Sequence, residues 1–237
     1  MGTAQLAISD ALDRDGSGLY RVGAISAVTF GLAYVVIFPL YASVGAPPDD
    51  GATWLSYAAG KTTAWWAILD LSVLTDFLLV PIALSLYLVL RSIDRNAMLI
   101  STAFVGLFVV LDLAVTWPNF ASLITLSGDY AAASTESQRA VYVAAAQYPS
   151  AVLSSVLLGA YSIVTLAIAL LVSGVVMLHG GFSRVAGFLG VASGILGIVS
   201  VAGPFVVSAS SLAVIVASVL TTIWAFAVGY RLYHLGR

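Results

Sequence analysis

Three aspartates, Asp70, Asp76 and Asp112, lie inside long apolar stretches of the sequence. A carboxylate in the middle of a bilayer costs about 2.5–3.5 kcal/mol, so each of these residues needs a compensating role. Two such acids that share a cavity could bind a cation or relay a proton. The alternative is that hydrogen-bonded aspartates tie neighbouring helices together without taking part in any chemistry.

Asp112 is followed at helical spacing by two further polar residues, Thr116 and Asn119. Residues four and seven positions apart share one face of an α-helix, so these three predict a polar stripe. A helix rises about 1.5 Å per residue, which places Asp70 about 10 Å and Asp112 about 8 Å below the outer face of the membrane. These similar depths predict a cavity open to the outside and lined by Asp70, Asp112, Thr116 and Asn119.

Asp76 is a separate candidate for binding a ligand or a proton. It follows Asp70 by six residues, which rotates its side chain about 120° around the helix and places it about 9 Å deeper. The two side chains therefore cannot both face one point. A small shift in where the span begins would put Asp70 at the wet interface, which favours a structural role for that residue.

Composition makes lipid the solvent for most of this chain. Of its 237 residues, 61% are hydrophobic and 8% are charged, whereas a soluble domain carries about 25% charged residues. Cysteine is absent, which excludes disulfides, thiolate metal sites and thiol catalysis. The net charge of -2 comes without a basic cluster, so no nucleic-acid partner is expected. The two histidines, His179 and His234, fall at predicted helix ends, and we expect neither a metal nor another cofactor.

The apolar runs predict an all-α, polytopic membrane protein, a six-transmembrane-helix bundle, because about 20 apolar residues cross the hydrocarbon as one helix. Residues 1–18 are expected to form a polar cytoplasmic tail, and residues 19–237 a single transmembrane domain. Pro118 is expected to break or end the third span. The expected spans cover residues 19–41, 63–90, 97–118, 150–178, 185–207 and 212–230.

Short interfacial helices are expected in the outer loops. Asp50 could cap a helix that carries Trp54 and Tyr57, aromatic residues typical of the membrane interface. A second such helix is predicted over residues 134–147, where Thr135 and Gln138 have the spacing of a capping box.

The positions of arginine and lysine orient the spans, because cytoplasmic loops carry the excess of these residues. With the N-terminus inside, the outer segments hold only Lys61 and Arg139. We therefore predict a multi-pass protein of the cell inner (plasma) membrane with its N- and C-termini in the cytoplasm. The cytoplasmic segments then hold Arg14, Arg21, Arg91, Arg95, Arg184, Arg231 and Arg237.

Four glycines, Gly187, Gly190, Gly194 and Gly197, lie in the fifth expected span. Gly190 and Gly194 have the small-xxx-small spacing that lets two membrane helices approach closely. The partner helix could belong to the same chain or to a second protomer. A gating hinge is the alternative interpretation.

Two apolar motifs carry a resemblance to a known family. They are the stretch 86–95 (LYLVLRSIDR), with residues 97–100 after it and the aspartate-bearing segment before it, and the C-terminal stretch 223–232 (IWAFAVGYRL). Together they resemble a bacterial membrane family catalogued as domain of unknown function number forty-three eighty-six. The resemblance implies a similar length and helix count over nearly the whole chain. That family has no established activity, so the resemblance implies no catalytic residues.

The favoured function is binding or transport of a cation, a proton or a small lipophilic molecule through the outer cavity. The alternative is a non-enzymatic accessory or assembly subunit of a larger membrane complex, or a homo-oligomer, suggested by the sparse loops and the glycine-rich span. A membrane enzyme that acts on a lipid, with an aspartate as general base, is the third hypothesis, and enzyme activity is not favoured. The lipid bilayer itself is the expected partner.

Overall fold

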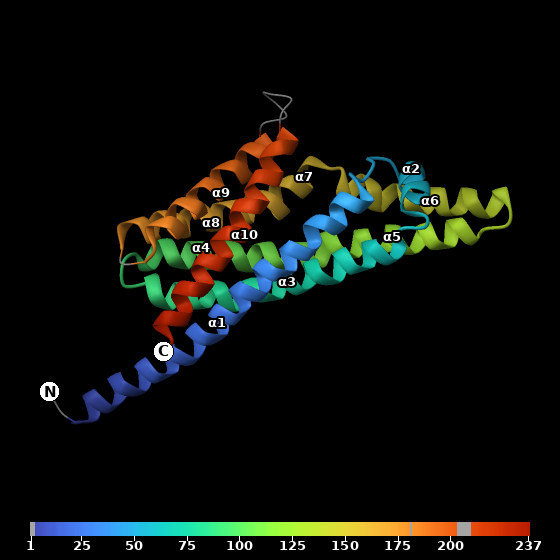
Figure 1. Cartoon of the computed structure of the whole chain (residues 1–237). Coiled ribbons are helices and arrows are strands. Elements are labelled where there is room, and N and C mark those ends of the chain that lie inside the picture. The colour runs from blue at the N-terminus through green and yellow to red at the C-terminus, as the bar shows by residue number, and fades with distance from the viewer. Residues whose placement is uncertain (1–2, 181, 203–209) are drawn as a thin grey trace.

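Helices account for every regular element in the computed structural model, which describes residues 3–180, 182–202 and 210–237. Two π-helical turns, η1 (Asp112–Thr116) and η2 (Gly159–Val164), interrupt longer helices. Figure 1 shows the helices in chain order. They are α1 (Thr3–Val44), α2 (Gly51–Ala58), α3 (Thr62–Leu90), α4 (Arg95–Leu111), α5 (Trp117–Ala132), α6 (Glu136–Leu153), α7 (Val156–Leu158), α8 (Thr165–His179), α9 (Arg184–Ala202) and α10 (Ser210–Leu235).

Six segments of the described chain are long and apolar enough to cross a membrane. The prediction of an all-α, polytopic membrane protein with six spans is therefore confirmed. The six segments are Ser17–Val44, Thr62–Leu90, Arg95–Ala132, Val156–His179, Arg184–Ala202 and Leu212–Leu235.

The six spans close into a ring. Contacts run from α1 to α3, from α3 to α4, from α4 to α8, from α8 to α9, from α9 to α10 and from α10 back to α1. Buried apolar side chains such as Phe30, Met98 and Trp224 fill much of the interior. On the outside, Ile25 and Phe188 expose 66% and 65% of their surface. An apolar outer surface of this kind matches lipid, since hydrocarbon is the solvent around the spans.

The third span differs from the prediction, because the helix does not break at Pro118. It continues through α4, η1 and α5 over the 38 residues Arg95–Ala132. Pro118 lies in the first turn of α5, and the wider π turn directly before it accommodates a residue that lacks a backbone N–H. At about 1.5 Å per residue the rod is about 57 Å long, nearly twice the hydrocarbon thickness.

The far part of this rod carries a cap made by α2, α5 and α6. In Figure 1, α5 and α6 run side by side away from both termini, and α2 lies against them. A second apolar core, separate from that of the ring, holds these helices to the start of α3 through Trp54, Trp65 and Leu123. As the sequence predicts, the Asp50 carboxylate caps α2 by accepting a hydrogen bond from the Thr53 amide at 2.9 Å. Hydrogen bonds from Thr53 also lower the pKa of Asp50.

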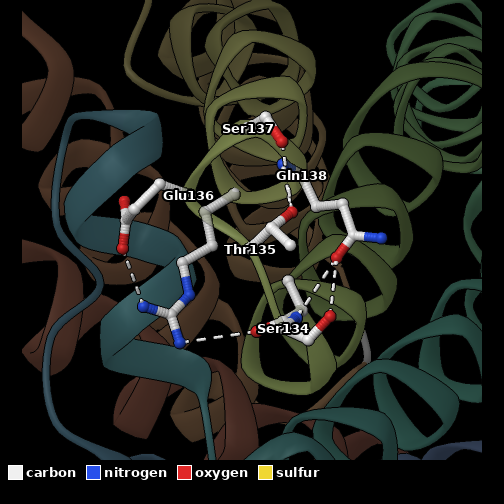
Figure 2. A network of polar contacts seen from close by, with 7 residues as sticks. Ser134, Thr135, Glu136, Ser137 and Gln138 are labelled. Carbon is white, nitrogen blue, oxygen red and sulfur yellow. Dashed lines mark hydrogen bonds and ion pairs between the residues drawn. The ribbon is translucent and has the colours of Figure 1, made fainter.

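The helix expected over residues 134–147 is longer than predicted and forms α6. Thr135 Oγ1 accepts from the Gln138 amide at 3.3 Å, and Gln138 Oε1 accepts from the Ser134 amide at 3.2 Å (Figure 2). This is the predicted capping box, shifted so that Gln138 bonds the residue before the cap. Arg139 and Glu136 form an exposed ion pair beside it at 3.1 Å.

The fourth span begins at Val156 and not at residue 150. The hydroxyls of Ser154 and Ser155 donate to the carbonyls of Ser150 and Val152, at 2.8 and 2.7 Å. Such bonds compete with helix continuation, and Ser155 in turn caps the next helix through the Leu158 amide. The apolar run therefore contains a turn that hydropathy alone does not reveal.

The ends of the chain also differ from the expected boundaries. The first helix begins at Thr3, so much of the expected tail belongs to α1. The last helix continues past residue 230 to Leu235, and Tyr230 packs on His234 with ring centroids 4.5 Å apart. Residues 203–207, the expected end of the fifth span, lie outside the described residues.

Candidate ligand-binding cavity

The ring of spans surrounds a partly open cavity of about 200 Å³. Each of the six spans contributes to its lining, so the cavity is a property of the whole bundle. A single water needs only about 10–15 Å³ of such space, which leaves room here for several waters or a small organic ligand. Its polar lining includes Asp76, Asp112, Ser193, Ser200, Ser218 and Thr221.

Asp76 reaches the cavity from the middle of α3 and is 3% exposed. Its Oδ2 accepts a hydrogen bond from Trp117 Nε1 at 2.6 Å, which joins α3 to the start of α5. A hydrogen bond of this length is strong in a low-dielectric interior. One oxygen of the Asp76 carboxyl therefore has a fixed protein partner.

Asp112 begins the π turn η1 and is 4% exposed. Neither its Oδ1 nor the buried Oγ1 of Thr116 makes a hydrogen bond of ordinary geometry among the described residues, although the two side chains lie one turn apart and interact. On α9, Ser193 is 2% exposed, and its Oγ is likewise unpartnered within the described part of the chain. Buried polar atoms are nearly always hydrogen-bonded, so unpartnered ones in a cavity indicate ligand contacts.

The π turn η1 explains how Asp112 and Trp117 come to share this cavity. The Trp117 amide donates to the carbonyl of Asp112, five residues earlier. This wider turn rotates the residues that follow relative to an α-helical path. The second π turn, η2, contacts η1, and its Ser162 and Ile163 line the same cavity. Turns of this kind occur frequently at functional sites.

The structure groups the aspartates differently from the sequence-based hypothesis. Asp70 is exposed on α3 and is not part of the cavity lining. Asn119 donates to the Val115 carbonyl of its own helix at 2.7 Å and does not line the cavity either. Thr116 lies buried one turn from Asp112. The acid that joins Asp112 is the deeper one, Asp76.

Sequence reasoning missed most of the lining, including Tyr34, Trp117, Ser193 and Thr221 on α1, α5, α9 and α10. Ser193 and Ser200 are seven residues apart, so they share a face of the glycine-rich helix. That spacing is a usable signal. Nothing in the sequence links Tyr34 to this face, because its position depends on how the ring closes.

The glycines of α9 pack against α8 of the same chain. A Cβ at Gly194 would lie 2.6 Å from the Ala167 carbonyl oxygen, and one at Gly190 would lie 3.1 Å from the Gly174 Cα. Cβ atoms at Gly187 and Gly197 would approach Leu178 and Ala167 side chains within 2.7 and 2.8 Å. This close approach brings Ser193 of α9 to the cavity.

The ring and its buried acids define a polytopic helical membrane protein with an acidic cavity between its spans. The family model described as Domain of unknown function (DUF4386) matches residues 19–234, and the chain belongs to that family. The resemblance seen in the sequence is thereby confirmed. Comparison with curated proteins and with solved structures returns no match for this chain.

Proposed function

We propose that this protein binds a small, positively charged solute in the cavity between Asp76 and Asp112 and carries it across the membrane. The observation that supports this proposal is the convergence of two buried carboxyls in one cavity. Among the described residues, no lysine or arginine lines that cavity. Ionisable residues inside a membrane are costly and usually mark an ion or substrate path.

The alternative, that these aspartates only hold neighbouring helices together through hydrogen bonds, accounts for Asp76 better than for Asp112. Asp76 bonds Trp117 across two helices, as a structural aspartate would. Asp112 Oδ1 makes no such bond within the described chain. An unsatisfied buried carboxyl oxygen destabilises the fold, so Asp112 is better explained by a ligand than by helix packing.

We further propose that both termini lie in the cytoplasm of a cell whose inner membrane holds the chain. Arg91, Arg95 and Arg184 lie at the ends of α3, α4 and α9 and support this orientation under the positive-inside rule. A cysteine placed at exposed Ser43, at the opposite end of α1, should then react with a membrane-impermeant maleimide added to intact cells. Labelling of this cysteine only after the cells are opened would show that the chain has the opposite orientation.

Transport is tested with the purified chain in proteoliposomes by solid-supported membrane electrophysiology. The probes are concentration jumps of Na⁺, of methylammonium and of protons. We expect the wild type to give a current with at least one probe. Asp112→Asn keeps the side-chain shape but removes the charge, and should reduce that current to the level of protein-free vesicles.

Asp70→Asn is the matched control, because it removes an equivalent carboxyl that lies outside the cavity. It should keep the wild-type current. The proposal fails if no probe gives a current above protein-free vesicles, if Asp112→Asn conducts like the wild type, or if both variants lose the current equally.

A further inference from the structure

Two unpartnered polar atoms from different walls of the cavity indicate what kind of ligand it accepts. They are Oδ1 of Asp112 on η1 and Oγ of Ser193 on α9. The two residues are 4% and 2% exposed, so the partners of these atoms must lie inside the cavity. A carboxylate oxygen only accepts hydrogen bonds. A ligand that satisfies Asp112 must therefore donate a hydrogen.

Three further hydroxyls of the lining face the cavity as acceptors. Ser200, Ser218 and Thr221 donate their hydrogens to carbonyls of their own helices, at 2.7, 2.9 and 2.8 Å. A hydroxyl that has donated its hydrogen still has a free lone pair. Asp76 has less capacity to bind a ligand, because its Oδ2 already accepts a hydrogen bond from Trp117. These walls thus present several acceptors around the Asp112 carboxyl, and no lysine or arginine among the described residues lines the cavity.

The size and the aromatic lining favour an organic cation over a bare metal ion. About 200 Å³ is much more than one ion occupies. Hard metal ions are held by six or more converging oxygens, and the described residues contain no group of three acidic or histidine side chains that could hold a metal. Tyr34, Phe108 and Trp117 line the same cavity, and aromatic faces attract organic ammonium groups.

We infer that the solute is a small organic ammonium that keeps N–H groups, a primary or secondary amine, with its nitrogen between Asp112 and Ser193. This inference rests on the proposed function and adds the substrate class. A quaternary ammonium carries the same charge but has no hydrogen to donate to Asp112. The cavity should therefore distinguish the two classes, although both would be attracted to its aromatic rings.

The absence of native cysteine allows a direct test. Ser218→Cys places a thiol in the cavity lining and leaves Asp112 and Ser193 unchanged. In proteoliposomes, its rates of modification by cationic aminoethyl and anionic sulfonatoethyl methanethiosulfonate are compared. Ser43→Cys, on the exposed end of α1, corrects for the intrinsic reactivity of each reagent. We expect the cationic reagent to be favoured about tenfold or more, because charge interactions strengthen in a low-dielectric site.

Competition between the cationic reagent and candidate ligands then identifies the class of ammonium that the cavity binds. Ethylammonium should slow modification of Ser218→Cys, whereas tetramethylammonium and Na⁺ at the same ionic strength should not. Equal protection by either of these competitors would overturn the inference while leaving a cation site in place. No protection by any of the three would also overturn it. Absence of the cationic preference, or a preference that survives Asp112→Asn, would instead contradict the proposed function itself.

Discussion

Replacing Gly174 with valine is expected to prevent α8 and α9 from packing at their native distance. A Cβ at Gly174 would lie 2.6 Å from the Val191 nitrogen and 2.8 Å from the Gly187 oxygen. Both are backbone atoms, so no side-chain rotation can relieve the clash. Overpacking of this kind costs about 1–3 kcal/mol and sometimes more. The free energy of unfolding in SDS titrations, and the monodisperse fraction in mild detergent, should both fall.

Gly106→Val is the matched control. Gly106 also lies within a span, on α4, but nothing lies within 4 Å of a Cβ built there. It therefore introduces the same side chain without a contact, and its unfolding free energy should stay close to that of the wild type. Equal destabilisation by the two variants would show that valine weakens these helices by itself and that the α8–α9 contact is not the cause.

Replacing Trp117 with phenylalanine should destabilise the protein by removing the donor to Asp76 Oδ2. A hydrogen bond between membrane helices contributes about 1–2 kcal/mol. Asp76→Leu should lower the cost of losing Trp117, because no buried carboxyl then remains unpaired. The measurement is a double-mutant cycle of unfolding free energies over these two positions, with an expected coupling of about 1–2 kcal/mol.

Trp66→Phe provides the comparison for the tryptophan change. Trp66 lies on α3 and is 39% exposed on the outside of the bundle. Its replacement makes the same chemical change without touching the cavity, and should show no coupling to Asp76→Leu. A coupling near zero for Trp117 as well would mean that the 2.6 Å contact does not stabilise the folded state.

The six spans could be predicted from the sequence because a helix that crosses lipid must be apolar along its whole length, and hydropathy measures that property directly. The third span shows where this reasoning stops. Proline is compatible both with a break and with a helix that first widens into a π turn. Which of the two occurs depends on packing: α5 has α2 and α6 to cover it, and so the helix continues past Pro118.

The sequence predicted that aspartates form the candidate site, but it did not predict which two of them lie in the same cavity. Counting residues along a helix gives a depth, which made Asp70 the expected neighbour of Asp112. The direction of a side chain around the helix depends on which spans are adjacent, and the ring places Asp76 on the inside and Asp70 on the outside. The π turn adds a further rotation after Asp112, which directs Trp117 to the cavity and removes Asn119 from it.

The two π turns also bear on how such a protein could diversify. A π turn holds one residue more than the α-helical path it replaces. Loss of a single codon within residues 112–116 would shorten the turn to the α-helical path and leave the helix after it in phase. Trp117 would keep its place beside Asp76, and the cap would keep its packing, while the residues left between Leu111 and Trp117 would take new directions around the helix. A one-residue deletion would therefore alter the wall of the cavity at η1 without disturbing the rest of the bundle.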